Sequence, residues 1–179
     1  MTPHFSLARS ALLAPFGLTD ASLTSVLSHI QQNAVDDADL YFQTTRSEGW
    51  SLEEGIVKTG NFSIDQGVGV RAVSGEKTAF AYSDDISLAS LMDAASVVRA
   101  IGAQGQSGRQ AISSKASTRA AGKLLPRKLY GMDDPIASQG SFEKVALLEK
   151  VEKLARAKDP RIKQVMAGIA AEHEIIYIA

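Results

Sequence analysis

The chain has 179 residues, of which 45% are hydrophobic and 22% charged, and this composition is typical of a globular protein that buries one core. A net charge of −1 and a pI near 6.3 exclude a general attraction to nucleic acid or anionic lipid. The absence of cysteine excludes disulfides, thiolate metal ligands and cysteine nucleophiles.

The first 17 residues contain a short apolar run, but Arg9 interrupts it and no small-residue cleavage site follows. No segment approaches the roughly 20 apolar residues that cross a bilayer. We therefore expect a cytoplasmic protein with no membrane partner.

The first predicted helix follows Thr19, a residue that caps helix N-termini. Its apolar residues recur every three or four positions, as on one helix face: Leu23, Val26, Leu27 and Ile30. The acidic turn at residues 36–39 ends this helix. Alternation over residues 40–45 then predicts a half-buried strand.

Further strands are predicted at residues 50–52, 55–58, 67–73 and 78–82, with the turn Ser-Gly-Glu-Lys at 74–77. Connections this short join antiparallel neighbours, since a parallel return needs a crossover of about a dozen residues. The pattern predicts a meander.

A second helix, capped by Asp85 or Ser87, is predicted to end near Gly102. Its core-facing residues are Leu91, Ala94, Ala95, Val98 and Ile101. Residues 102–140 lack periodicity and carry basic side chains, so we expect a long, mobile, basic loop there.

A third helix is predicted to begin at Ser141 and to stop at residues 159–160, Asp-Pro. One face would carry Leu147, Leu148, Val151, Leu154 and Ala155. The exposed side would carry the pairs Glu149–Lys153 and Glu152–Arg156. Two strands are expected at 162–171 and 175–179, around a polar turn at 172–174. A strand at the last residue suggests a piece of a longer protein.

Together these elements predict an α+β fold, in which a mainly antiparallel sheet, a meander, is packed by two or three helices. We expect one domain over residues 1–179, with the mobile loop at about 102–140.

The sequence offers few candidates for catalysis or metal binding. Residues 173–177, His-Glu-Ile-Ile-Tyr, resemble HExxH, but Tyr177 replaces the second histidine and the segment has a strand pattern. His4 lies near a terminus expected to fray, and His29 lies on a helix edge. We therefore expect no metal ligands and no catalytic residues in this chain.

Two glycine motifs and several acidic residues are candidate ligand sites. Residues 67–71 contain GxG without a following helix, and residues 75–78 fit a hairpin turn better than a phosphate loop. Acidic residues at 36–39 and 53–54 are expected to be solvated rather than to bind a cation.

The meander offers a possible peptide or partner surface formed by Tyr41, Gln43, Trp50 and Phe62. An exposed strand edge beside them could pair with an extended peptide. Alternatively, Trp50 and Phe62 fill the core between sheet and helices. A third alternative is nucleic-acid binding through the basic loop. It is disfavoured because the loop has no aromatic side chain beyond Tyr130 on which bases could stack.

Four strings of the meander resemble the zinc-bearing TldD-type subunits of the TldD/PmbA metalloprotease family, also called modulators of DNA gyrase. The strings are Asp39-Leu-Tyr-Phe-Gln43, Asp65-Gln-Gly-Val-Gly-Val-Arg-Ala-Val73, Ser74-Gly-Glu-Lys77 and Phe80-Ala-Tyr82. The resemblance covers essentially the whole chain and is weak through the basic loop.

The resemblance implies an N-terminal domain that precedes a catalytic domain with an HExxxH zinc motif and a cysteine ligand, neither of which occurs here. It also implies pairing with a zinc-free paralogue, PmbA or TldE, to degrade unfolded peptides such as antitoxins and peptide-antibiotic precursors. The alternative is a free-standing peptide- or partner-binding module without enzymatic activity. For the isolated domain, we expect self-association through a sheet edge or through residues 175–178.

Overall fold

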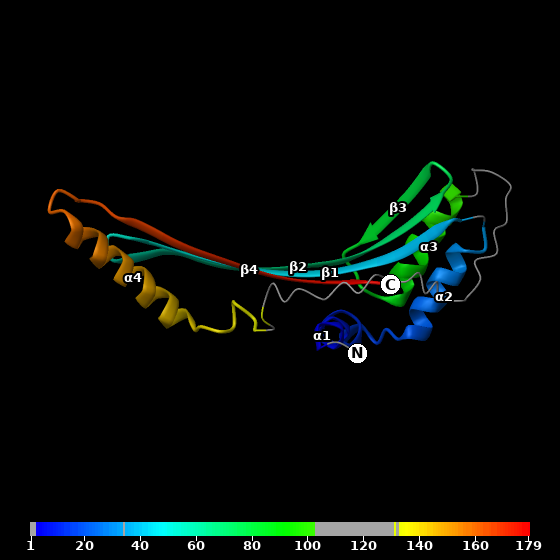
Figure 1. The fold of residues 1–179 in the computed structure, drawn as a ribbon, viewed down its shortest axis with the longest axis horizontal. Coiled ribbons are helices and arrows are strands. Elements are labelled where there is room, and N and C mark those ends of the chain that lie inside the picture. The colour runs from blue at the N-terminus through cyan, green and yellow to red at the C-terminus, as the bar shows by residue number, and fades with distance from the viewer. Residues whose placement is uncertain (1–2, 34, 103–130, 132) are drawn as a thin grey trace, which may run out of the picture. The chain divides into compact units, whose positions relative to one another are not determined.

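The computed structural model describes residues 3–33, 35–102, 131 and 133–179. Its four strands form one antiparallel sheet in the order β3-β2-β1-β4, so the predicted α+β class is confirmed (Figure 1). In chain order the elements are α1 (Pro3–Leu12), the 3-10 helix η1 (Ala14–Phe16), α2 (Asp20–Ile30), β1 (Asp37–Glu53), β2 (Ile56–Ser74), β3 (Lys77–Ser83), α3 (Leu88–Gly102), α4 (Ser141–Lys158) and β4 (Met166–Ile178).

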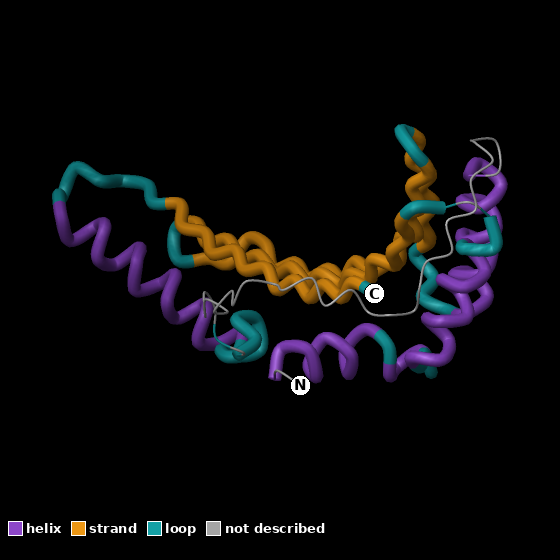
Figure 2. The backbone as a smooth tube through the Cα atoms, turned by 45° about the vertical axis from the view of Figure 1, so that its right-hand side comes forward, coloured by secondary structure: helices purple, strands orange, loops and turns teal. Residues whose placement is uncertain are grey.

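The strands are longer than predicted, as the continuous orange segments in Figure 2 show. The strands expected at 40–45 and 50–52 are both parts of β1, and those at 55–58 and 67–73 are parts of β2. Glycines and polar residues interrupt the sequence alternation, but both strands continue through them. Glu54 and Gly55, between β1 and β2, have φ of 51° and 73°, as both central residues of a type I′ turn require.

β4 is also continuous, so the predicted turn at residues 172–174 is wrong. Glu172 and Glu174 are exposed whereas His173 is half-buried, which is the ordinary two-face alternation of a strand. The polar triplet contains neither glycine nor proline, and nothing in it demands a change of direction.

The chain divides into two compact units. Unit 1 comprises Met1–Gln43, Gln66–Met132 and Ile175–Ala179, and unit 2 comprises Thr44–Asp65 and Asp133–Glu174. The expected basic loop lies mostly outside the described residues. Its last part, residues 133–140, adopts a turn in which the Asp134 carboxylate accepts hydrogen bonds from the Ile136 and Ala137 N–H groups.

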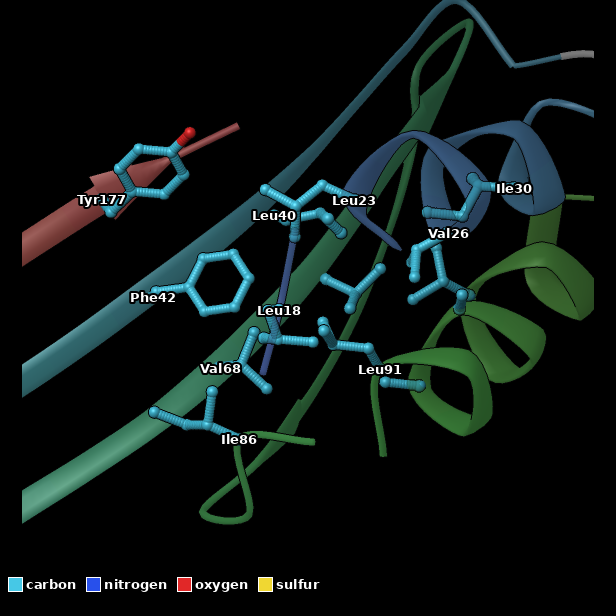
Figure 3. Close-up of a cluster of buried hydrophobic side chains, with 14 of the residues drawn as sticks. Leu18, Leu23, Val26, Ile30, Leu40, Phe42, Val68, Ile86, Leu91 and Tyr177 are labelled. Atoms are coloured by element: carbon cyan, nitrogen blue, oxygen red, sulfur yellow. The ribbon is translucent and has the colours of Figure 1, made fainter. Parts of the chain in front are cut away.

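Unit 1 has an apolar core between its helices and its sheet (Figure 3). The predicted faces of α2 and α3 are confirmed for the described side chains. Leu27 is partly buried against the core, and the others are buried: Leu23, Val26, Ile30, Leu91, Ala94, Ala95 and Val98. The predicted caps are also present, since Thr19 accepts from the Ser22 N–H and Ser87 from the Ser90 N–H, each at 3.2 Å.

Residues 3–12 form the helix α1 instead of a frayed segment, with Ala8 and Leu12 buried on it and Leu13 buried directly after it. This helix was not among the predicted elements. No single helix among the described residues is long and apolar enough to cross a membrane. One pair of helices, Pro3–Phe16 and Asp20–Ile30, meets the criteria of length and composition together, but it is bent by 80°.

Unit 2 consists of α4, the turn before it, and the parts of β1, β2 and β4 that belong to this unit. Leu52 and Leu148 are its most buried apolar side chains, at 1% and 3% exposure. Ile136 and two charged residues, Lys144 and Glu152, are also buried in this unit.

Candidate functional site

The four residues of the predicted peptide surface lie in different units. Tyr41 and Gln43 belong to unit 1 and are half-buried, whereas Trp50 and Phe62 belong to unit 2. Phe62 is 56% exposed and Trp50 is half-buried, so neither belongs to the fully buried core. A core-filling role for Phe62 is therefore wrong, and its exposure leaves it accessible to a partner.

Trp50 is held in place by a charged cluster within unit 2. Its indole Nε1 donates to Glu48 Oε1 at 2.5 Å, and the Lys144 ammonium lies 2.6 Å from the same oxygen. Lys144 also donates to the Ile136 carbonyl at 2.8 Å. The side chains of Glu48 and Lys144 are only 12% and 6% exposed, so this ion pair is largely removed from water.

The environment of Glu48 keeps its carboxylate ionised. The hydrogen bond from Lys144 lowers the pKa of Glu48 against the opposing effect of desolvation, and the hydrogen bond from Trp50 lowers it further. The pair joins α4 to β1, with Trp50 attached to the same carboxylate. This cluster was not predicted from the sequence, because charged residues of a helix are ordinarily expected on its exposed side.

Gly60 makes room for the indole ring of Trp50 on the neighbouring strand. A Cβ at position 60 would lie 2.8 Å from Trp50 Cζ3 and 2.9 Å from Cε3, closer than such atoms approach. Ser51 and Thr59, one position further along, share a hydrogen bond of 2.6 Å between their hydroxyls. The ring therefore has one defined position, against the backbone of β2.

His173 lies in β4, which confirms the strand pattern that argued against a helical HExxH site. Its Nδ1 is 3.7 Å from Asp134 Oδ2, and Arg46 pairs with the same carboxylate. Within the part of the chain that the structure describes, no group of three or more His, Asp or Glu side chains could hold a metal ion. The described residues therefore do not fit a zinc site.

The other two histidines lie in unit 1. His4 is exposed on α1 and not in a frayed segment. His29, on α2, lies 3.1 Å from Ser96 Oγ and within 3.5 Å of the Arg99 guanidinium. The three groups link α2 to α3.

Several acids considered as cation ligands make contacts within the protein. Asp36 accepts from the Gly75 N–H at 2.6 Å, and Asp39 pairs with Arg71. In unit 2, Glu53 accepts from Gln164 Nε2 at 2.5 Å. Residues 67–71 lie in β2 and residues 75–76 form the turn to β3, as predicted.

Residues 38–102 match the family described as PmbA/TldA metallopeptidase domain 1. A metalloprotease TldD homolog of Haemophilus influenzae is 41% identical over 169 residues, covering 94% of this chain and 34% of that protein. A second, from Buchnera aphidicola subsp. Schizaphis graminum, is 35% identical over 96% of this chain and 34% of its own length. The chain thus spans about a third of these curated relatives.

Solved structures share the fold at low identity. A protein of Bacteroides thetaiotaomicron described as a modulator of DNA gyrase has a TM-score of 0.59 at 12% identity, covering 90% of this chain and 37% of that one. TldE from Thermococcus kodakarensis has a TM-score of 0.52 at 14% identity, covering 88% and 35%. The sequence relatives and the family match show that the chain belongs to the TldD/PmbA metalloprotease family and corresponds to the N-terminal domain of its members.

Proposed function

We propose that this chain is the non-catalytic N-terminal domain of a TldD-like zinc metalloprotease. With a PmbA/TldE-like paralogue, the whole enzyme would degrade unfolded peptides, such as antitoxins and peptide-antibiotic precursors, in the cytoplasm. The observation that carries this proposal is the 41% identity to a metalloprotease TldD homolog over 94% of the chain. That match spans a third of the homolog, which leaves the other two thirds to supply the catalytic residues and the zinc.

The role of this domain would be to bind partner or peptide chains, since the described residues do not fit a zinc site. Phe62 and the half-buried Trp50 support this role, because aromatic side chains supply much of the binding energy at protein interfaces. The net charge of −1 favours a peptide over a nucleic acid as the partner.

The test compares two proteins, the 179-residue chain and the longer gene product that contains it, the latter with and without its paralogue. We expect the longer product to retain about one zinc per chain after dialysis and to cleave an unfolded casein-like substrate only with the paralogue present. The 179-residue chain should do neither. Stoichiometric zinc in the 179-residue chain, or no cleavage by the paired longer product, would contradict the proposal.

The alternative, a peptide- or partner-binding module without enzymatic activity, draws on the same exposed Phe62. A longer product that lacks zinc and yet binds unfolded peptide, with binding weakened by Phe62→Ala, would favour it. The zinc content of the longer product therefore distinguishes the metalloprotease hypothesis from the binding-module hypothesis.

A further inference from the structure

The sheet has three stretches of strand edge with no neighbouring strand among the described residues. β3 and β4 are the outer strands of the order β3-β2-β1-β4. β3 pairs with β2 only from Val68 onward, so residues 56–67 of β2 also lack an outer neighbour in the described part of the chain. An unpaired edge presents backbone N–H and C=O groups that another strand can pair with.

The three edges differ in how well they resist pairing. β3 is short, with seven residues, and β4 carries Glu172 and Glu174 on its exposed row. Short length and charges are both common protections of an edge. Residues 56–66 of β2 are exposed throughout and contain only two charges, Lys58 and Asp65. This stretch is the least protected edge that the structure describes.

The β2 edge has different side chains on its two faces, because residues two apart point the same way. Ile56, Phe62 and Ile64 share one face and are 59%, 56% and 56% exposed. Thr59 and Asn61 lie on the other face. A well-matched occupant is a strand that is apolar on one face and polar on the other, and the β2 edge of a second copy has this pattern.

We propose that two copies of this chain pair antiparallel through residues 56–64 of β2, about a two-fold axis at Gly60. This register places Ile56 opposite the partner's Ile64 and Lys58 opposite the partner's Phe62. It opposes no like charges, and Lys58 gains an aromatic ring as neighbour. A two-fold contact requires such a self-complementary surface. The inference goes beyond the proposed function, because it needs neither zinc nor a paralogue.

Sedimentation of the 179-residue chain over a concentration series tests the surface. We expect a monomer–dimer equilibrium, in which Phe62→Lys or Ile64→Lys raises the dissociation constant about tenfold or more, since symmetry introduces each lysine twice. Phe142→Lys is the matched control, because Phe142 is 92% exposed but lies on α4. A monomer at every concentration, or an equal effect of Phe142→Lys, would overturn the proposal.

Disulfide trapping tests the register, since the chain has no cysteine of its own. Thr59 and the partner's Asn61 would face each other, at a Cα separation that a disulfide can bridge. Mixing Thr59→Cys with Asn61→Cys under air, with oxygen as the oxidant, should therefore give the mixed disulfide faster than either variant links to itself. Circular dichroism checks that both variants are folded. Equal rates for mixed and self-linked products would refute the register, whatever the outcome of the zinc and cleavage assays on the longer protein.

Discussion

The Lys144 ammonium and the Glu48 carboxylate lie 2.6 Å apart, almost out of contact with water. Replacing Lys144 by Met leaves the Glu48 carboxylate charged and buried, without the ammonium that now pairs with it. We expect Lys144→Met to lower the free energy of unfolding by about 3 kcal/mol, the lower end for breaking a buried pair. Urea unfolding followed by circular dichroism measures it. Lys150→Met, at an exposed position of α4, is the control and should change stability by less than about 0.5 kcal/mol.

Glu48 also predicts how stability depends on pH. Because folding lowers its pKa, its contribution is present above the unfolded-state value of about 4.3 and is lost as the pH falls through the lower folded value. Stability should therefore drop below about pH 4. Glu48→Gln should flatten that part of the curve, whereas Glu172→Gln, at an exposed strand position, should not. Identical acid profiles for Glu48→Gln and the unaltered chain would refute this role.

Gly60 and Gly168 offer a matched pair of glycine substitutions. A Cβ at position 60 would meet the Trp50 ring at 2.8 Å, whereas at position 168 the nearest atom is the Trp50 carbonyl oxygen at 3.5 Å. Gly60→Ala should therefore destabilise by about 1–3 kcal/mol, the usual cost of overpacking. It should also shift the emission of Trp50, the single tryptophan. Gly168→Ala should leave the emission unchanged; a shift of equal size there would contradict the assigned ring position.

At the scale of an element, the buried face of α4 differs from the face that the sequence predicted to be buried. Leu148 is buried, as expected, but Leu147, Val151 and Leu154 are 43%, 44% and 56% exposed. The residues buried with Leu148 are Lys144 and Glu152, one helical turn on either side. The prediction failed because it assumed that charged side chains face water, whereas these two have partners in the fold.

Glu152 illustrates the same rotation of α4. The sequence placed its pair with Arg156 on the exposed side of the helix, and the pair is present at 2.9 Å. However, the Glu152 side chain is only 8% exposed, so the pair lies at the buried side. Arg156 also donates to the Lys163 carbonyl at 3.0 Å and thereby ties the end of α4 to the segment that follows it.

Two leucines of α4 provide the corresponding test. Leu148→Ala should cost about 2–4 kcal/mol of stability, because it opens a cavity in a packed site. Leu154→Ala should cost less than about 1 kcal/mol, since the side chain is already half in water. Thermal unfolding of both variants measures the difference. Equal losses of stability in the two variants would contradict the observed orientation of α4 and favour the buried face that the sequence predicted.

At the scale of the whole chain, the first helix and the last strand meet in unit 1. The Tyr177 ring lies 6.0 Å from that of Phe42 and 5.7 Å from that of Phe5. The Arg9 guanidinium donates to the Tyr177 hydroxyl at 3.2 Å and to the Asp20 carboxylate at 2.5 Å. Leu40 and Ala179 exchange two backbone hydrogen bonds, at 2.9 and 3.0 Å. The last residues of the chain are therefore part of the fold of unit 1.

Tyr177 should accordingly be important for the stability of unit 1. Tyr177→Ala should cost about 3 kcal/mol or more, as for other buried aromatic residues. Tyr177→Phe keeps the ring and removes only the hydroxyl, so it should cost about 1 kcal/mol. Chemical unfolding measures both. A loss from Tyr177→Phe as large as from Tyr177→Ala would show that the hydrogen bond, and not ring packing, holds the two ends together.

The sequence by itself determined the fold class, the family and the local signals. Period-two alternation and short turns predicted the antiparallel meander, and the spacing in α2 and α3 predicted their buried faces, because these signals depend on neighbours within a few positions. The caps Thr19 and Ser87 are equally local. The four strings between Asp39 and Tyr82 carried the family resemblance.

The tertiary structure alone decided the strand lengths, the inward face of α4 and the burial of Glu48 with Lys144. Each depends on residues far apart in sequence: Glu48 and Lys144 are buried together only because α4 packs on β1, and Trp50 fits only because Gly60 lies opposite it. α1 likewise depends on its distant partner Tyr177. Local patterns carry no record of such pairings, since the energy that fixes them arises only when distant segments come together.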